Sequence, residues 1–169
     1  IEVEGPVHEV FRVAEGFARH AAEKAKRGRK RFFLHSKIRD RKAIEHHYDV
    51  SNEFYRLFLG ESMVYSCAYY RTGNETLETA QEHKLDHILG KLMVRPGERL
   101  LDIGCGWGAL IVHAAKKYGA VATGITLSRQ QYEFARRRIL EEGLEGRCEV
   151  RLQDYRELSG EGVFDKITS

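Results

Sequence analysis

The sequence is poor in cysteine and has no long hydrophobic run. Its 169 residues include three cysteines, Cys67, Cys105 and Cys148, and no two of them have C-x-x-C spacing. An odd number of cysteines without that spacing indicates neither a disulfide framework nor a zinc site, and is typical of a reducing compartment. No apolar stretch approaches the ~18 residues needed to span a bilayer, and the N-terminus lacks a signal-peptide pattern. We therefore expect a soluble, cytoplasmic protein without a metal site.

Proline is also scarce, and the sequence has neither internal repeats nor low-complexity tracts. With two prolines and 42% hydrophobic residues, the composition suits one globular domain plus a smaller attachment. The net charge of +3 is unevenly distributed. Between residues 20 and 42, ten Lys or Arg accompany two acidic residues, so this stretch carries +8 and the rest of the chain −5. The basic character is thus a local feature.

The basic stretch contains the sequence EKAKRGRKRFF, which ends in two aromatic residues. Phe32 and Phe33 could enter a membrane interface while the cations meet anionic headgroups. Nucleic-acid phosphates would suit the same cations. A solvated helix face or linker is a third interpretation. The residues alone leave all three open.

The first half of the chain has the spacing of amphipathic helices. Apolar residues three and four apart predict a helix over residues 7–27. Residues 41–60 are predicted to be helical in two short pieces, the second capped by Ser51 or Asn52. A longer helix is predicted over residues 76–93. That helix is expected to be capped by Thr76 and to bury Leu77, Ala80, Leu85, Ile88, Leu89 and Leu92.

From residue 96 onward, short strands alternate with helices. The predicted strands are ERLLDI, AVATGIT, CEVRLQ and VFDKITS, and the predicted helices are GALIVHAAKKYG and SRQQYEFARRRILEEG. This alternation predicts an α/β fold with a parallel sheet and right-handed crossovers. The chain stops within the fourth strand, and an uncovered parallel sheet exposes apolar surface and backbone groups. We therefore expect these residues to be a portion of a longer polypeptide.

Three glycines, Gly104, Gly106 and Gly108, lie between the first strand and its helix. Such a turn lets a ligand approach the backbone, and the free N–H groups of the helix favour the ligand's polar part. A dinucleotide is one candidate, because GCGWGA satisfies G-x-G-x-x-G/A. S-adenosylmethionine is the other. Asp102 directly before the glycines would repel a pyrophosphate but could anchor an ammonium group, which favours S-adenosylmethionine.

The end of the second strand bears on the same choice. It reads Thr126-Leu127, without the Asp or Glu that holds the ribose of NAD. Arg129 could instead hold the 2′-phosphate of NADP, so an NADP-binding reductase stays an alternative. A nucleic-acid methyltransferase that uses residues 20–42 as a phosphate-binding arm is another.

A second cluster of candidate residues precedes the glycine turn. Residues 43–70, AIEHHYDVSNEFYRLFLGESMVYSCAYY, concentrate imidazole, phenol and thiol groups, a composition that suits the lining of a pocket. Each residue taken singly has an ordinary structural explanation, and a lone cysteine is most often a small buried hydrophobe. Their clustering ahead of a cofactor turn favours the pocket. The residues concerned are His46, His47, Tyr48, Asp49, Asn52, Tyr65, Ser66, Cys67, Tyr69 and Tyr70.

The motifs HHYDVSNEFYRLFLGESMVYSCAYY, LDIGCGWGALIVHAAKKYGAVATGITLSRQQ and QDYREL closely resemble the cyclopropane-fatty-acid synthase family, which includes mycolic acid cyclopropane synthases. The resemblance covers about residues 41–169. It implies the Rossmann-like fold of class I S-adenosylmethionine-dependent methyltransferases, here incomplete and preceded by N-terminal helices. The expected layout is the end of a lipid-binding domain (1–40), a helical lid and acyl-pocket segment (41–95) and the first half of the cofactor-binding domain (96–169).

The resemblance implies methyl transfer from S-adenosylmethionine to the cis double bond of an unsaturated phospholipid acyl chain, with ring closure to a cyclopropane. A bound bicarbonate ion would remove the proton. Val50 and Ser51 resemble actinobacterial relatives, some of which make 10-methyl or 10-methylene fatty acids, so these products stay alternatives. The expected location is the cytoplasm, peripheral to the inner face of the membrane. A homodimer or a second chain completing the fold is a further expectation, and no nucleic acid is expected as a partner.

The resemblance also assigns roles to positions. Tyr65 and Ser66 are expected to meet the methionine part of the cofactor, Tyr48 to belong to a lid, and the backbone of Cys67 to help hold bicarbonate in catalysis. The remaining bicarbonate ligands would lie beyond Ser169, so the chain alone is expected to be inactive. Taken together, the cofactor-binding candidates are Tyr48, Tyr65, Ser66, Asp102, Gly104, Gly106, Thr126, Leu127, Gln131, Asp154 and Tyr155.

Overall fold

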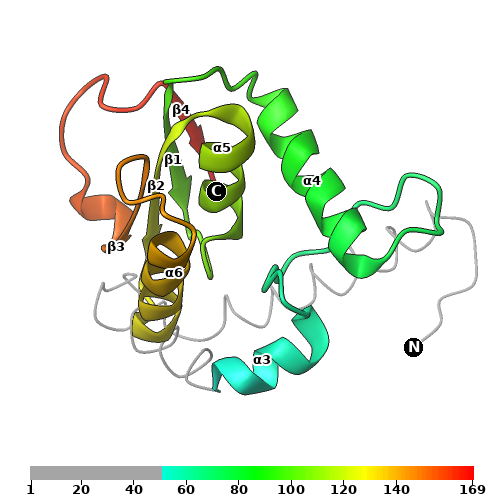
Figure 1. Ribbon diagram of the computed structural model, residues 1–169. Helices are drawn as coiled ribbons and strands as arrows, with labels where there is room; N and C mark the ends of the chain where they lie inside the picture. The colour runs from blue at the N-terminus through cyan, green and yellow to red at the C-terminus, as the bar shows by residue number, and fades with distance from the viewer. Residues whose placement is uncertain (1–50) are drawn as a thin grey trace, which may run out of the picture. The chain divides into compact units, whose positions relative to one another are not determined.

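The computed structural model describes residues 51–169, so the predicted helix 7–27 and the basic stretch 20–42 lie outside the described residues. The described chain combines a parallel sheet with helices that precede and connect its strands (Figure 1). The elements are α3 (Asn52–Leu59), α4 (Leu77–Lys91), β1 (Arg99–Ile103), α5 (Ala109–Tyr118), β2 (Val121–Thr126), α6 (Arg129–Glu141), β3 (Cys148–Leu152), the 3-10 turn η1 (Tyr155–Glu157) and β4 (Lys166–Thr168).

Helices α3 and α4 begin at residues with capping hydroxyl groups, and α5 ends at a glycine, as the sequence predicts. The Ser51 hydroxyl accepts the N–H of Phe54 at the start of α3, and Thr76 accepts the N–H of Thr79 at the start of α4. Helix α5 ends at Gly119, whose left-handed conformation lets its N–H reach a carbonyl of the last turn. These caps confirm the second helical piece of residues 41–60, the helix predicted over residues 76–93 and the helix GALIVHAAKKYG; the first piece of residues 41–60 lies outside the described residues.

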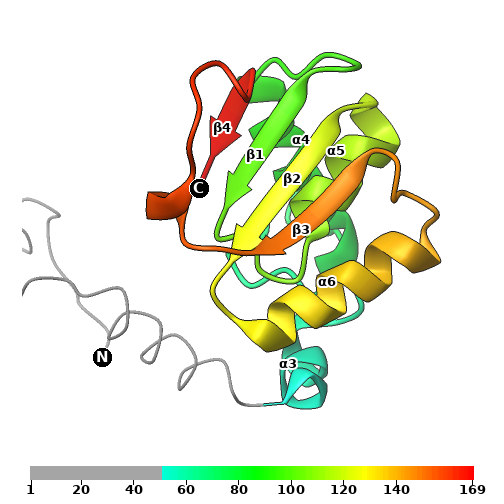
Figure 2. The same cartoon turned by 90° about the vertical axis from the view of Figure 1, so that its left-hand side faces the viewer.

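The sheet has the order β3-β2-β1-β4, and every pair of neighbouring strands is parallel. The register places Asp102 of the central strand β1 opposite Gly124 of β2 and Thr168 of β4. All strands therefore point the same way, and their carboxyl ends meet at one edge of the sheet (Figure 2). The predicted parallel α/β arrangement is confirmed.

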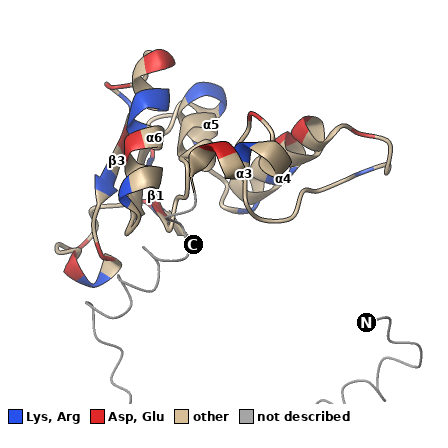
Figure 3. Ribbon diagram, turned by 90° about the horizontal axis from the view of Figure 1, so that it is seen from below, with Lys and Arg blue, Asp and Glu red and all other residues tan. Residues whose placement is uncertain are grey.

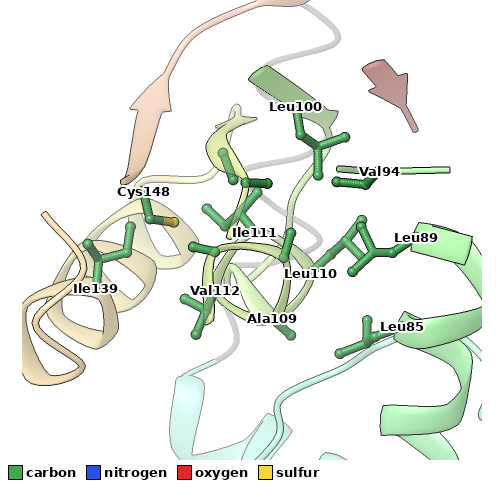
Figure 4. Close-up of a cluster of buried hydrophobic side chains, with 14 of the residues drawn as sticks. Leu85, Leu89, Val94, Leu100, Ala109, Leu110, Ile111, Val112, Ile139 and Cys148 are labelled. Atoms are coloured by element: carbon green, nitrogen blue, oxygen red, sulfur yellow. The ribbon is translucent and has the colours of Figure 1, made fainter. Parts of the chain in front are cut away.

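Helices α4, α5 and α6 lie on the same face of the sheet (Figure 2). The core between them joins Leu100 of β1, Ile111 of α5 and Leu89 of α4, each fully buried (Figure 4). Burying such a side chain contributes about 1.5–3 kcal/mol. On α4, Ala80, Leu85 and Leu89 are buried as predicted, whereas Leu77 and Ile88, and Leu92 directly after the helix, are half-buried.

A polar cluster fixes α4 against α5. The Asp86 carboxylate accepts a hydrogen bond from Lys117 Nζ at 2.6 Å, lies 2.7 Å from His113 Nε2 and accepts from the Tyr118 hydroxyl at 3.2 Å. Partial burial raises the pKa of Asp86, but the hydrogen bonds from His113 and Lys117 outweigh it and lower the pKa to about 2. The carboxylate is thus ionised at neutral pH and holds the two helices in register.

Helix α3 packs through a separate apolar cluster. Tyr55, Leu59 and Met63 are buried against Trp107 of the glycine turn. The Trp107 indole Nε1 donates to Asn52 Oδ1 at 2.7 Å. The segment that precedes the Rossmann-like sheet is therefore attached directly to the predicted cofactor turn.

Charges of both signs are interspersed on the helices visible in Figure 3. Lys116 of α5, for example, forms an ion pair of 2.6 Å with Glu142 at the end of α6. The described part of the chain thus mixes its charges, in contrast to the stretch 20–42.

Candidate functional site

A cavity of about 580 Å³ lies at the carboxyl edge of the sheet. The carboxyl end of each strand contributes to it: the last residue of β1, Ile103, and the residues that follow the strands, Gly104 after β1, Leu127 after β2, Gln153 after β3 and Ser169 after β4. Ligands of open α/β sheets bind at this edge, where the strand order reverses. In this sheet the reversal lies between β1 and β4.

The glycine turn forms one wall of the cavity. Gly104 and Gly106 have φ values of +78° and +55°, and a Cβ built on either would have no protein atom within 4 Å. Side chains are therefore absent there although the protein itself leaves room for them. The N–H groups of Gly104 and Cys105 both donate to Ile125 O, at 2.9 and 3.0 Å, which fixes the turn against β2.

At position 108 a glycine is needed for a different reason. A Cβ at this position would lie 2.9 Å from Ala135 Cβ of α6. The glycine thus permits the close approach of α5 to α6. It also leaves the N-terminus of α5 without a side-chain cap, and Ala109 and Leu110 of that first turn line the cavity.

Asp102 is a buried carboxyl group in the wall of the cavity. Only 7% of the residue is exposed, and none of the residues 51–169 donates a hydrogen bond to its carboxylate or pairs with it. Burial raises the pKa of Asp102 to about 7, because desolvation disfavours the charged form. Such a group is stabilised in its charged form by a cationic ligand.

The end of β2 is rigid and neutral. Thr126 Oγ1 donates to Gln131 Oε1 at 2.7 Å, and the N–H of Ser128 donates to Thr126 Oγ1 at 3.2 Å. All three residues are buried. Thr126, Leu127 and Gln131 line the cavity as the sequence predicts.

Two further predicted residues, Asp154 and Tyr155, follow β3. Tyr155 lines the cavity, whereas Asp154 is buried beside it and is not part of the lining. The Asp154 carboxylate accepts from the Arg156 N–H at 2.9 Å and forms an ion pair with the Arg156 guanidinium. Asp154 therefore supports the turn that carries Tyr155.

Residues 63–66, between α3 and α4, form another part of the cavity wall. Tyr65 and Ser66 line the cavity, together with Met63 and Val64. Cys67, the predicted bicarbonate contact, is exposed and outside the lining. Tyr48 and His47, the predicted lid, lie outside the described residues. The structure thus gathers Tyr65, Ser66, Asp102, Gly104, Gly106, Thr126, Leu127, Gln131 and Tyr155 around one cavity, while their individual roles stay predictions.

Some residues of the cavity lining were not predicted from the sequence. Lys84 and Trp107 line the cavity, as does Gln153. Lys84 and Gln81 interrupt the apolar side of the predicted helix 76–93, and polar residues on a buried face were the signal available for both. Gln81 is 4% exposed.

Within residues 51–169, no helix is both long and apolar enough to cross a membrane. The same residues contain no cluster of three or more His, Cys, Asp or Glu side chains that could hold a metal ion. The features of the cavity that can contact a ligand are its glycine edge, its buried carboxyl group and its apolar lining.

Comparison with known proteins places these features in a family. The family model described as mycolic acid cyclopropane synthetase matches residues 35–169. A probable fatty acid methyltransferase of Pseudomonas putida is 42% identical over 169 residues, which is 100% of this chain and 43% of that protein. The cyclopropane-fatty-acyl-phospholipid synthase of Escherichia coli is 42% identical over 142 residues, 84% of this chain and 35% of that protein.

Among solved structures, the chain is similar to the mycolic acid cyclopropane synthase CmaA1 complexed with SAH and CTAB. The TM-score is 0.71 at 37% sequence identity, and the match covers 75% of this chain and 44% of that one. The chain spans less than half the length of the relatives described here.

Proposed function

The chain belongs to the mycolic acid cyclopropane synthetase family, and from this we propose that it provides the cofactor-binding part of an S-adenosylmethionine-dependent methyltransferase that modifies fatty acyl chains. Its fold is the Rossmann-like fold of such methyltransferases, as predicted. The observation that carries the proposal is the buried, unpaired Asp102 carboxyl group beside the bare glycine edge of the cavity.

The cavity suits the two ends of S-adenosylmethionine. Asp102 would pair with the amino group of its methionine part, because this pairing offsets the desolvation that burial imposes on the carboxylate. Gly104 and Gly106 leave space along the backbone. Tyr155 would offer an aromatic face to the adenine, and Gln131 would meet the ribose; both residues line the cavity. When bound, the cofactor supplies an electrophilic methyl group on a sulfonium ion.

The lipid substrate is supported by the lining and by the relatives. Leu85, Ile88 and Leu110 give the cavity an apolar side, which excludes water as carbocation chemistry requires. The two curated relatives described above are named for fatty acid and fatty-acyl-phospholipid chemistry. The nucleic-acid methyltransferase and NADP-dependent reductase alternatives are therefore not favoured.

For the reaction we propose methyl transfer to the cis double bond of a phospholipid acyl chain. The alkene electrons would form the new bond to the methyl carbon as the bond from that carbon to the sulfonium sulfur breaks, so that S-adenosylhomocysteine leaves and a carbocation remains on the chain. A base then takes a proton from the added methyl group, and the C–H electrons close the cyclopropane ring. The proposed base is bicarbonate, which the backbone of Cys67, next to Ser66 of the lining, would help to hold. A 1,2-hydride shift that moves the cation to the methylated carbon, followed by loss of a proton from the added methyl group, would give the 10-methylene product instead. Reduction of that alkene by an external hydride donor would give the 10-methyl product.

The proposed location is the cytoplasmic face of the membrane. The support is the basic stretch 20–42 with Phe32 and Phe33. Reversing the charge of four basic residues between 24 and 31 should lower binding to anionic vesicles and leave affinity for S-adenosylhomocysteine unchanged. Equal vesicle binding by the variant and the parent protein would remove this role from the stretch.

The experiment that tests the function is mass spectrometry of lipids from cells that express the polypeptide containing this chain at its full natural length. The cells are fed methyl-labelled methionine. An acyl chain heavier by one labelled CH₂ would support methylene transfer, and fragmentation would separate a ring from a branch. Label in nucleic acid, or no labelled lipid above the level of cells without the protein, would contradict the proposal.

A further inference from the structure

Residues 62–66, of which 63–66 line the cavity, have neither helical nor strand hydrogen bonding. They lie between α3 and α4 (Figure 1). Met63 and Val64 are buried whereas Tyr65 and Ser66 are exposed, and the backbone groups of such an irregular segment find partners in other parts of the chain. Those partners come from helices on both sides of the segment.

The first end is held by α6. Arg138 Nη1 donates to Ser62 O at 3.0 Å. The next residue, Met63, is 1% exposed and has a φ of +50°. A non-glycine residue adopts this left-handed conformation only where its surroundings impose it. The segment is thus held in one defined conformation as it enters the cavity wall.

The second end is held by α4. Gln81 Nε2 donates to Val64 O at 3.3 Å and to Ser66 O at 3.1 Å. Lys84 Nζ donates to Ser66 O at 3.1 Å and to the Ser66 hydroxyl at 2.8 Å. Both carbonyls and the hydroxyl at this end are therefore oriented by two side chains one helical turn apart.

The bond from Lys84 determines which ligand group Ser66 can meet. Because Ser66 Oγ accepts from the ammonium group, its own O–H is left to act as a donor. A ligand atom at Ser66 must then be an acceptor, and the neighbouring cation favours an anionic one. Lys84 is the one Lys or Arg among the described residues that line the cavity, and Asp102 is the one acid.

The surroundings of Lys84 disfavour a charged ammonium group. Burial lowers the pKa of Lys84, against an opposing contribution from Cys67. A lysine of an amphipathic helix ordinarily extends into water to avoid such desolvation. Lys84 is half-buried, and its ammonium group donates to the carbonyl and the hydroxyl of Ser66.

We propose that Lys84 is a positioning residue that orients Ser66 to receive the carboxylate of the methionine part of S-adenosylmethionine, with Gln81 fixing the backbone on which Ser66 lies. The inference rests on the proposed function. The cavity would then match the charges of the ligand, with Asp102 facing its ammonium group and the Lys84–Ser66 pair facing its carboxylate.

The test compares two ligands that differ in the amino-acid end. S-adenosylhomocysteine carries it, and 5′-methylthioadenosine lacks it. Calorimetry on the full-length polypeptide should show that Lys84→Met weakens S-adenosylhomocysteine binding about tenfold or more, as expected for the loss of a charge-assisted hydrogen bond. Affinity for methylthioadenosine should not change. Lys84→Arg, which keeps a cationic donor, should recover part of the loss.

Lys91→Met is the matched control, because Lys91 is exposed on the same helix. It should alter neither affinity. Equal S-adenosylhomocysteine affinity in Lys84→Met and the parent protein would overturn the inference. Equal weakening of both ligands would also overturn it, because Lys84 would then support the fold of the cavity in general. A parent protein that binds neither ligand would refute the proposed function itself.

Discussion

Asp102→Asn should stabilise the ligand-free protein while weakening cofactor binding. The substitution keeps the size of the side chain and removes a charge that is buried without a partner among residues 51–169. An ionised carboxylate in such a place costs free energy that a neutral amide avoids. The residue would thus be retained for binding at the expense of stability.

The magnitude follows from the pKa, which burial raises from 3.8 to about 7. Below pH 3.8 the carboxyl group is protonated in both the folded and the unfolded state and costs nothing. As the pH rises, the folded protein holds this proton more tightly than the unfolded chain, so stability is lost until the pH passes about 7. At about 1.4 kcal/mol per pH unit, the cost is about 2 kcal/mol at pH 5 and about 4 kcal/mol above pH 7.

The assay is urea unfolding of the parent protein and Asp102→Asn, without ligand, at pH 5 and pH 8. Every other titrating group is common to both proteins and cancels in the difference. The stabilisation by Asp102→Asn should be larger at pH 8 than at pH 5 by about 3 kcal/mol, because about 1.4 kcal/mol is lost per pH unit between pH 5 and about 7. Saturating S-adenosylhomocysteine should reduce this advantage. A stabilisation that is equal at both pH values, or larger at pH 5, would refute the assignment of a buried, unpaired carboxylate.

Two further substitutions test the walls of the cavity. Gly106→Val should abolish S-adenosylhomocysteine binding, because it places methyl groups in the ligand's space at a φ of +55° that a β-branched residue avoids. Calorimetry measures the affinity, and Gly146→Val, at an exposed glycine, is the control. Unchanged affinity in Gly106→Val would contradict the assignment of the turn to cofactor binding. Asn52→Ala should lower the free energy of unfolding by about 1 kcal/mol, because Trp107 Nε1 loses its 2.7 Å acceptor. Urea unfolding measures this effect, and the control Leu57→Ala, at a position 85% exposed, should leave stability unchanged.

Much of the fold could be predicted because its signals are local. Ser51 and Thr76 cap helices within their own first turns, and Gly119 ends one by its own conformation. The alternation of strands and helices predicted the parallel sheet. The order β3-β2-β1-β4 depends on how crossovers pack, and no stretch of sequence states it.

In the candidate site, too, the residues with a local sequence signal could be predicted, and those that depend on long-range contacts could not. The glycine turn and Asp102 are adjacent in sequence, so a strand, a turn and a helix suffice to predict them. Lys84 acts on Ser66, 18 residues earlier, and Trp107 bonds to Asn52 across 55 residues. These contacts arise only when α3 and α4 pack against the sheet, and no local pattern encodes them.

The close approach of α5 and α6 has an evolutionary consequence. A Cβ at Gly108 would lie 2.9 Å from Ala135 Cβ, so neither position can grow while the other stays as it is. Descendants of this sequence that keep the two helices at this spacing should vary little at both positions. Where position 135 does enlarge, the helices must separate, and the first turn of α5 would carry its N–H groups away from the cavity. Residues 108 and 135 should therefore covary across the family although neither is expected to touch a ligand.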